Sequence, residues 1–176
     1  MSAGPPVEIH AYEPTWAARF EEERRLLEPI LSPLLVGGIH HVGSTAVPGL
    51  AAKPVVDIMA GVRSLEDARS VFPQLAASSY CYFDHRREMH WFCKPSPSVR
   101  TYHLILVEPG GPWWQARLLF RDYLRAHADA AAEYESLKLE SARRHSGDRE
   151  AYTDAKAAFV EAIVALARAE AEAAPR

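Results

Sequence analysis

The sequence predicts an α/β fold of the α+β kind, with one mixed sheet of about four or five strands and flanking helices. Three observations support this. Short apolar and β-branched runs, bounded by turn residues, recur through residues 38–107. A segment with helical spacing precedes them, and residues 113–171 are helical in pattern. The 176 residues, 48% of them hydrophobic, are expected to form a single domain, residues 1–176, around a sizeable core.

The N-terminal part is expected to hold an edge strand and a helix. Residues 7–12 alternate between apolar and polar side chains, which favours a short strand. A helix is expected from Pro14 to about Leu31, since proline suits the first position of a helix, and Pro33 ends it. Its apolar side chains recur at helical spacing, and its charged side chains, Glu23 among them, are expected to face solvent.

The central part is expected to hold strands on either side of one helix. Residues 38–42 and 55–62 are apolar, β-branched runs typical of strands. Residues 64–78 favour a helix, with Ser64 as its N-cap and Pro73 disturbing its last turns. The remaining strand-like segments are residues 80–83, 87–94 and 99–107. The last two flank a run of proline and serine, so they are expected to form a hairpin.

The C-terminal third is expected to form three helices that pack on the sheet or beside its cleft. The breaks between them are short, and large apolar side chains gather on one face of the first, as in a core helix. The expected helices cover residues 113–127, 130–145 and 148–171.

Composition and charge narrow the classes of function. The formal charge of −3 argues against a general nucleic-acid-binding protein, which is usually basic, but it allows a local basic cleft. Cys81 and Cys93 form neither a metal-binding pattern nor a disulfide framework, so both are expected to be reduced thiols. No stretch is long and apolar enough to cross a bilayer, and residues 1–6 lack the pattern of a signal peptide. These observations predict a cytoplasmic protein.

The sequence centres on a glycine-serine turn followed by an acidic strand residue. Gly43 and Ser44 follow a short strand, where the missing side chain of glycine lets the backbone approach a ligand closely. Asp57 is the one charged side chain in the run 55–62, and a buried carboxylate needs a hydrogen-bond donor, a cation or a metal. Two interpretations stay open. Asp57 either caps the turn by accepting its N–H groups, or holds a divalent cation beside phosphate oxygens bound by the turn.

These residues resemble a known signature. Gly43-Ser44, a connector and a strand bearing Asp57 are similar to the Gly-Ser…Asp-x-Asp pattern of the DNA polymerase β-like nucleotidyltransferase superfamily. The whole run HVGSTAVPGLAAKPVVD, residues 41–57, resembles the GrpB family, whose fold is nucleotidyltransferase-like. Similar stretches cover almost the whole chain, from about residue 7 to residue 167, namely residues 102–104 and 120–125 and the tyrosine-lysine pairs at 134/138 and 152/156.

The resemblance implies a phosphate and metal site, and the chain departs from it at two positions. A nucleotidyltransferase needs two carboxylates on one face of this strand to hold Mg²⁺ against a triphosphate. Because strand side chains alternate, Met59 stands where the second acid should be, and thioether sulfur is a poor Mg²⁺ ligand. Glu88, on an expected strand, is the candidate replacement. The family pattern His-Leu-His reads His103-Leu104-Ile105 here, so one histidine is missing.

The candidate site residues follow from the turn, the acidic strand and the resemblance. The predicted catalytic residues are Asp57, Ser44 and His103. The predicted Mg²⁺ ligands are Asp57 and Glu88. The predicted phosphate-binding residues are Gly43, Ser44, Thr45, Lys53, Arg121 and Arg125. His41 is a further candidate by its position directly before the turn.

Several of these side chains also have a purely structural interpretation. A histidine between apolar neighbours, such as His103, is more often a hydrogen-bonded core residue than a ligand or base, and Lys53 has the alternative of an exposed loop lysine. Arg117, Arg121 and Arg125 recur every four residues. A solvated stripe paired with nearby acids is favoured for Arg117, whereas a stripe and a phosphate clamp stay open for the other two. Stacking of each tyrosine under a lysine stem explains the two tyrosine-lysine pairs.

Two classes of function remain. The expected ligand is a nucleotide or another phosphate-containing small molecule, and neither nucleic acid in general nor a membrane is an expected partner. The protein is then either a nucleotidyl or phosphoryl transferase, or a catalytically degenerate binding module that keeps the fold and the pocket. A protein–protein adaptor built on the C-terminal helices is a third possibility. The acceptor substrate and the oligomeric state do not follow from the sequence.

Overall fold

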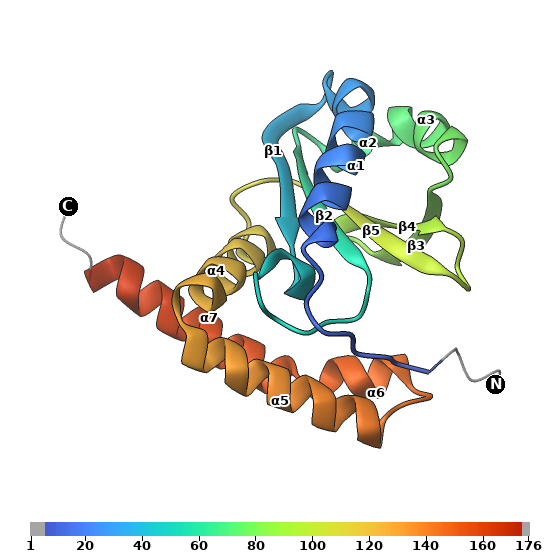
Figure 1. The fold of residues 1–176 in the computed structure, drawn as a ribbon. Coiled ribbons are helices and arrows are strands. Elements are labelled where there is room, and N and C mark those ends of the chain that lie inside the picture. The colour runs from blue at the N-terminus through green and yellow to red at the C-terminus, as the bar shows by residue number, and fades with distance from the viewer. Residues whose placement is uncertain (1–5, 174–176) are drawn as a thin grey trace.

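The computed structural model describes residues 6–173 and contains a five-stranded mixed sheet with helices on both faces (Figure 1). The strands are β1 (Leu35–Val42), β2 (Val56–Val62), β3 (Cys81–Arg86), β4 (Met89–Pro95) and β5 (Arg100–Val107). Their order across the sheet is β1-β2-β5-β4-β3, with β2 parallel to β5 and all other neighbours antiparallel. The predicted mixed sheet and the predicted hairpin of β4 and β5 are confirmed.

One face of the sheet carries the main hydrophobic core. Val56 and Ile58 of β2 are fully buried there against Trp16 and Leu27 of α1 (Thr15–Leu31), because alternate strand residues point to the same face. Figure 1 shows α1 crossing in front of β1 and β2. The same face is covered further along by α2 (Leu65–Ala68) and α3 (Phe72–Ala77), joined by the 3₁₀ turn η2 (Arg69–Val71).

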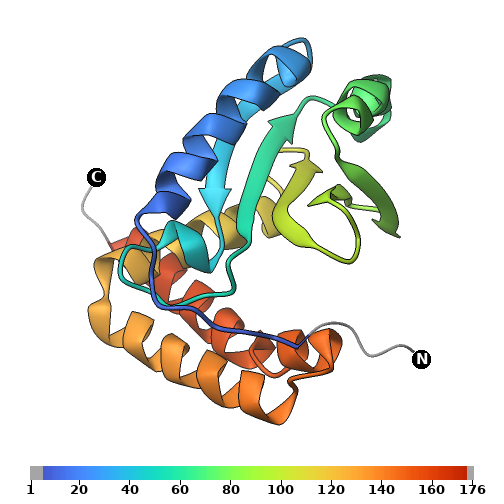
Figure 2. The ribbon, with the colours of Figure 1, turned by 45° about the vertical axis from the view of Figure 1, so that its right-hand side comes forward.

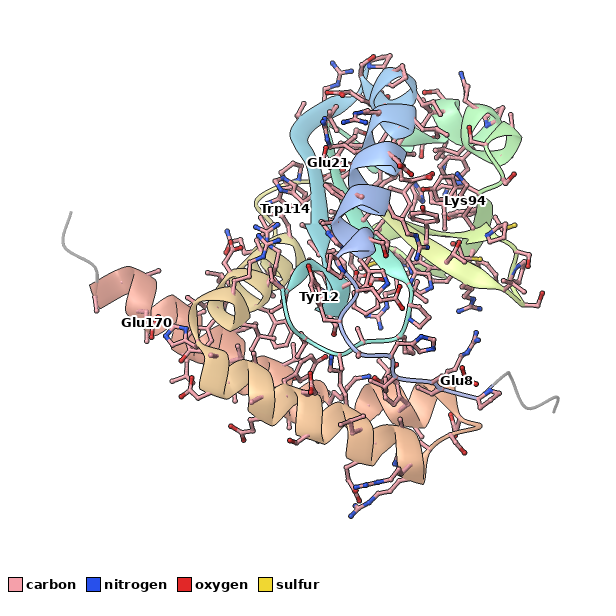
Figure 3. The ribbon with its side chains drawn as sticks, in the orientation of Figure 1. Glu8, Tyr12, Glu21, Lys94, Trp114 and Glu170 are labelled. Carbon is pink, nitrogen blue, oxygen red and sulfur yellow. The ribbon has the colours of Figure 1, made fainter. Side chains whose placement is uncertain are left out.

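The opposite face of the sheet is covered by α4 (Pro112–Ala126). Met59, Ile105 and Val107 pack there with Trp114 of α4 in a separate cluster. Figure 3 shows Trp114 on the α4 side of β1, whereas Lys94 lies on the other side of α1, over the strands. The alternation predicted for β2, with Asp57 and Met59 on one face, is therefore confirmed.

The C-terminal helices form a layer below the sheet (Figure 2). They are α5 (Ala128–Arg144), α6 (Arg149–Asp154) and α7 (Ala157–Ala173). Phe120 and Leu124 of α4 pack with Tyr134 of α5, and Val47 and Leu50 of the β1–β2 connection join the same cluster. This packing brings the C-terminal helices against the segment between Gly43 and Asp57. None of the helices among residues 6–173 is long and apolar enough to span a membrane.

Three expectations about the secondary structure were wrong in detail. Residues 7–12 form no strand and make only one bridge, between His10 and Ala52. The helix expected over residues 64–78 is interrupted by η2. Pro73 lies in the first turn of α3, where the backbone N–H that proline lacks would have no partner within the helix. Ser64 does cap α2, as predicted. The helix expected over 148–171 is broken after α6.

Glu23 of α1 was expected in solvent and is buried instead. Its carboxylate accepts hydrogen bonds from Lys94 Nζ at 2.7 Å and from the Tyr80 hydroxyl at 2.9 Å. Lys94 lies 71 positions and Tyr80 57 positions after Glu23 in the chain. The charge pattern of the helix alone does not reveal such distant partners.

Candidate functional site

The turn after β1 is shaped by Gly43. Its φ of 72° lies in the left-handed region that favours glycine, and the short 3₁₀ helix η1 (Ser44–Ala46) follows it. The register of the antiparallel strands places Val42 opposite Asp57, so the turn lies beside the start of β2. A Cβ on Gly43 would collide with the Oδ2 atom of Asp57. The predicted association of the glycine-serine turn with Asp57 is therefore present.

Asp57 forms a hydrogen-bonded pair with His103. The two residues are register partners on the parallel strands β2 and β5, and His103 Nδ1–H donates to Asp57 Oδ1 at 2.8 Å. Burial opposes ionisation of Asp57, but the hydrogen bond and charge of His103, with the charges of Lys53 and Arg117, hold its pKa below the ordinary value. The Nε2 atom of His103 is buried and has no hydrogen-bond partner among residues 6–173. The carboxylate therefore meets a histidine rather than the N–H groups of the turn.

Two lysines share the ring of Tyr152 beside this pair. Lys156 Nζ lies 3.2 Å and Lys53 Nζ 5.0 Å from the ring centroid. Lys156 is only 8% exposed, and burial, reinforced by the charges of Lys53 and Lys138, lowers its pKa to about 7. Burial also lowers the pKa of Lys53, against the attraction of Asp57. Lys156 stacks on the ring of Tyr152, as expected. The ammonium groups of Lys53 and Lys156 therefore both lie close to the carboxylate of Asp57.

Lys138 and Glu135 hold the segment that leads to Lys53. Lys138 Nζ donates to the carbonyl of Ala51, and the Ala51 N–H donates to Glu135 Oε2 at 2.6 Å. Lys138 is 2% exposed, and burial lowers its pKa to about 8, against the pull of Glu135. Both side chains come from α5, so this helix fixes the backbone two residues before Lys53.

Tyr134 of α5 connects the glycine turn to the same helix. Burial raises the pKa of Tyr134 to about 12, while a hydrogen bond with Ser44 and the charge of Arg117 oppose that shift. The Tyr134 ring stacks on Phe159 at 5.3 Å, and Lys138 Nζ lies 5.0 Å from its centroid. Ser44 therefore lies close to Tyr134 of α5.

The three arginines of α4 take different positions. Arg121 donates to the carbonyl of His41 at 3.1 Å, and Arg125 donates to the carbonyl of Ala46 at 2.8 Å. Both guanidinium groups thus hold the backbone on either side of the turn. Arg117 lies 4.7 Å from the Trp113 ring centroid, is largely exposed, and contributes to lowering the pKa of Asp57. The solvated stripe favoured for Arg117 is therefore an incomplete description, since its charge acts on the site.

A small cavity opens next to His103. Its volume is about 60 Å³, and its polar lining is basic. The lining residues are Pro6, Val7, Lys53, Val55, Arg100, His103 and Arg149. Among residues 6–173 no carboxylate lines it, so an anion would meet Lys53, Arg100 and Arg149 without a competing acid. A single phosphate group is of the size that such a cavity admits.

His41 and Thr45, two candidate site residues beside the Gly43 turn, make structural contacts. His41 is buried, stacks on Phe20 of α1 with ring centroids 4.8 Å apart, and places Nε2 2.9 Å from the Thr45 hydroxyl. Burial is the main reason that the pKa of His41 falls to about 4. The Thr45 hydroxyl also donates to the carbonyl of Val55 at 3.4 Å. The side chains of His41 and Thr45 therefore bind each other on the face of the sheet that α1 covers.

Glu88 does not supply a second acid to Asp57. It was expected on a strand but lies in the turn between β3 and β4. The next residue but one, His90, pairs with Leu106, whereas Asp57 pairs with His103, so Asp57 and Glu88 are about 16 Å apart along the strands. Met59 is fully buried. Within residues 6–173, no group of three or more histidine, cysteine or acidic side chains is placed to hold a metal ion.

Several basic residues of the site were not predicted from the sequence. Lys138 and Lys156 were interpreted as stacked on tyrosines, and Arg100 and Arg149 were not singled out. The repeated Tyr-x-x-x-Lys spacing, once within α5 and once from α6 into the turn that follows it, was the available signal. This spacing indicates that each lysine follows its tyrosine by about one helical turn. It does not indicate that the lysines lie on the side that meets the Gly43 turn.

Solved structures with the same architecture include an RNA terminal U-transferase. This cytoplasmic enzyme matches with a TM-score of 0.53 and 16% identity, over 78% of this chain and 42% of that chain. A chain of the GLD-2/RNP-8 complex matches with a TM-score of 0.59 and 13% identity, over 88% and 60% of the two chains. At such identities the likeness shows the fold alone, which is nucleotidyltransferase-like.

Closer relatives share the sequence as well. The crystal structure of the conserved protein GrpB from Enterococcus faecalis matches with a TM-score of 0.84 and 30% identity, over 91% of this chain and 96% of that chain. The glutamate-rich protein GrpB of Alkalihalophilus pseudofirmus is 36% identical over 85% of this chain and 88% of its own length. The UPF0157 protein YqkA of Bacillus subtilis is 36% identical over 85% of this chain, which spans only 44% of that protein. The GrpB protein family model matches residues 6–166. The chain therefore belongs to the GrpB family.

Proposed function

We propose that this protein binds a small molecule bearing phosphate groups, a nucleotide in the first instance, between the Gly43 turn and the C-terminal helices. The observation that carries the proposal is an excess of positive charge. Lys53, Lys156 and Arg117 all act on the single carboxylate of Asp57. Arg100 and Arg149 add to this charge around the cavity beside His103. The chain as a whole carries a formal charge of −3, so the excess is local.

Lys94 provides a comparison within the same molecule. Its ammonium group is half-buried and pairs with the buried Glu23 at 2.7 Å. Among residues 6–173, neither Lys53 nor Lys156 has a carboxylate within ion-pair distance. A buried ammonium group without a partner is costly. A bound anion would balance these charges, and phosphate accepts hydrogen bonds from several donors at once.

The turn supports the same proposal from the opposite side. Because Gly43 has no side chain, the turn approaches the carboxylate of Asp57 closely, and Ser44 lies close to Tyr134 of α5. Arg121 and Arg125 hold the carbonyls of His41 and Ala46, which flank the turn. We assign these two arginines to positioning the turn, and we assign direct phosphate binding to Lys53, Lys156 and Arg117.

The donor set does not fit a two-metal transfer site. Such chemistry uses carboxylates that bridge two ions roughly 3.5–4 Å apart. Here Met59 occupies the second position, and Glu88 lies at the far end of the sheet. Asp57 alone suits Mg²⁺ only where phosphate oxygens and water complete its coordination. The proposal is therefore binding of a nucleotide, with Mg²⁺ carried by the nucleotide itself.

A second candidate, phosphoryl transfer without a metal-bound nucleophile, is favoured by the His103–Asp57 pair. Asp57 fixes His103 through Nδ1, and the histidine lines the basic cavity with its Nε2 unpartnered among residues 6–173. A histidine held in this way acts as a general base when an acceptor hydroxyl reaches Nε2. The substitution His103→Gln separates the two candidates, because it removes the base while retaining a polar side chain. If the wild type and His103→Gln both bind the ligand and neither transfers a phosphoryl group, the result favours the binding module.

The decisive experiment is a calorimetric titration with inorganic phosphate, pyrophosphate, ATP, UTP and dephospho-coenzyme A, each with and without Mg²⁺. A ligand that binds the native state also raises the melting temperature. Lys53→Met and Lys156→Met are each expected to weaken binding about tenfold or more, since each removes a charge-assisted contact. Arg143→Met, which removes an exposed cation paired with Glu140 on the surface of α5, is the matched control and is expected to leave affinity unchanged. Equal affinity in all four proteins would refute the proposal, as would the absence of binding by any of these phosphates.

A further inference from the structure

A row of side chains crosses four strands at the level of Asp57. Cys81 of β3 is the register partner of Cys93 of β4, Cys93 is the partner of His103 of β5, and His103 is the partner of Asp57. Directly opposite residues on neighbouring strands project to the same face of a sheet. The two cysteines therefore stand next to each other, and Cys93 stands next to the histidine of the candidate site.

The register also sets the distance between the two cysteines. Directly opposite residues of antiparallel strands have Cα atoms about 4.5 or 5.5 Å apart, depending on the hydrogen-bonding position. Disulfides span Cα separations of roughly 4.4–6.8 Å, so either position fits. The rings of Phe83 and Trp91, the next register pair on this face, lie 5.1 Å apart, as adjacent side chains should. Both cysteines are free thiols.

The two thiols differ in their access to solvent. Cys93 is fully buried, and burial raises its pKa, which suppresses its direct reaction with an oxidant. Cys81 is half-buried on β3, which is the edge strand of the sheet. An oxidant from solvent therefore reaches Cys81 first, and Cys93 lies beside it as the one other thiol in residues 6–173.

We propose that Cys81 and Cys93 form an oxidation site that closes to an intramolecular disulfide when the protein encounters a peroxide. The peroxide oxidises the Cys81 thiolate to a sulfenic acid, and its O–O bond breaks with release of water or an alcohol. The sulfur of Cys93 then attacks the sulfur of Cys81, the S–O bond breaks, and the hydroxide leaves with the thiol proton as water. Two thiols and one peroxide thus give one disulfide, two electrons passing from sulfur to the peroxide oxygens. A dithiol reductant reverses the change.

The test is treatment of the folded protein with hydrogen peroxide, followed by thiol counting and intact-mass measurement. The wild type is expected to lose both thiols together, to lose the mass of two hydrogen atoms, and to regain both thiols with dithiothreitol. Cys81→Ala should keep the Cys93 thiol at least about tenfold longer than the wild type keeps its thiols, because the remaining thiol is buried. Cys93→Ala should stop at the sulfenic acid of Cys81, which dimedone traps with a corresponding gain in mass.

Other outcomes would overturn the proposal. Gain of oxygen atoms by the wild type without loss of hydrogen would show that the thiols oxidise separately. A disulfide-linked dimer in place of the intramolecular product would show that Cys81 reacts as an exposed thiol without Cys93. If a variant does not fold, the mass and the reducibility of the oxidised wild type still decide the question.

Discussion

The Oδ2 atom of Asp57 fills the space that a Cβ on Gly43 would need. The carboxylate is therefore set by two contacts, the turn on one side and the hydrogen bond from His103 on the other. The close approach explains why a glycine with φ of 72° follows β1, since any other residue would both strain the backbone and displace the carboxylate.

Replacing Gly43 with alanine is expected to destabilise the protein by about 3 kcal/mol, from the left-handed backbone and the collision with Asp57 together. Gly49→Ala is the matched control, because Gly49 has φ of 82° and, among the described residues, no atom within 4 Å of the position that a Cβ would take. This control should cost only about 1 kcal/mol. Urea unfolding of both variants measures the difference, and equal losses would mean that Asp57 moves aside freely.

Asp57→Asn is expected to remove a pH-dependent part of the stability. The pKa of Asp57 in the folded protein lies below its ordinary value of 3.8, so its contribution is present above about pH 4 and is lost as the pH falls through the folded value. The wild type should exceed the variant by about 1 kcal/mol at pH 7, a modest figure because the side chain is 32% exposed. Chemical unfolding from pH 7 to pH 3 tests this. Asp154→Asn, on the exposed face of α6, should show no such difference, and a constant gap across the range would contradict the prediction.

Lys156→Met is expected to stabilise the protein at neutral and acidic pH. The folded pKa of Lys156 is about 7, whereas the ordinary value is 10.5, so the unfolded chain binds more protons between these pH values. Stability linked to Lys156 therefore rises as the pH increases from 7 towards 10.5. The variant should lose most of this slope and keep a smaller one from Lys138, whose pKa burial lowers to about 8. Unfolding curves from pH 6 to pH 9.5 provide the measurement, and an unchanged slope would show that Lys156 is an ordinary charged lysine.

Phosphate binding is expected to take up protons at pH 8. At that pH Lys156 is mostly neutral, and an anion beside it favours the charged form. Titrations of pyrophosphate in buffers of different ionisation enthalpy measure the number of protons taken up. The wild type should take up close to one proton per ligand at pH 8 and fewer at pH 6. A Lys156→Met protein that still binds weakly should show little uptake, and uptake that does not depend on pH would contradict the assignment.

Met59→Asp is expected to gain Mg²⁺ affinity and lose stability. The side chain of Met59 is fully buried, and a second carboxylate there lacks a partner when no metal is bound, which costs about 3 kcal/mol or more. Mg²⁺ should recover part of this loss, since two carboxylates on one face suit the ion. Unfolding with and without Mg²⁺ measures the recovery, and Met59→Leu is the control that preserves volume. If Mg²⁺ recovers nothing, the Asp57 face is not a latent metal site.

Much of the sheet could be predicted because its pattern is local. The alternation of Val56 and Ile58 with Asp57 and Met59 places each side chain on the correct face without any knowledge of the rest of the chain. Residues 7–12 alternate in the same way but form no strand. Their backbone is bound at Val7 by the carbonyl of Ser146 and at His10 by Ala52, so these contacts take the place of strand pairing.

The site could be predicted only in part because its basic residues come from distant segments. Asp57 and His103 lie in the sheet and Gly43 lies in the turn directly after β1, where the motif and the strand pattern find them. Lys156 lies in the turn between α6 and α7. The approach of this turn to the site depends on packing of Val47 against α4, α5 and α7, and helical spacing does not specify that contact. The burial of Glu23 could not be predicted for the same reason, because its partner Lys94 is 71 positions away in the chain.

The hydrogen bonds from α5 to Ala51 have a consequence for the order in which the protein is made. Ala51 is bound by Glu135 and Lys138, which leave the ribosome 84 and 87 residues later than Ala51 itself. All five strands are synthesised before either side chain exists, and domains gain structure from the N-terminus onwards during translation. A nascent chain therefore carries its sheet, Asp57 and Lys53 before Arg149 and Lys156 are made, so the site proposed to bind phosphate is completed only after the sheet.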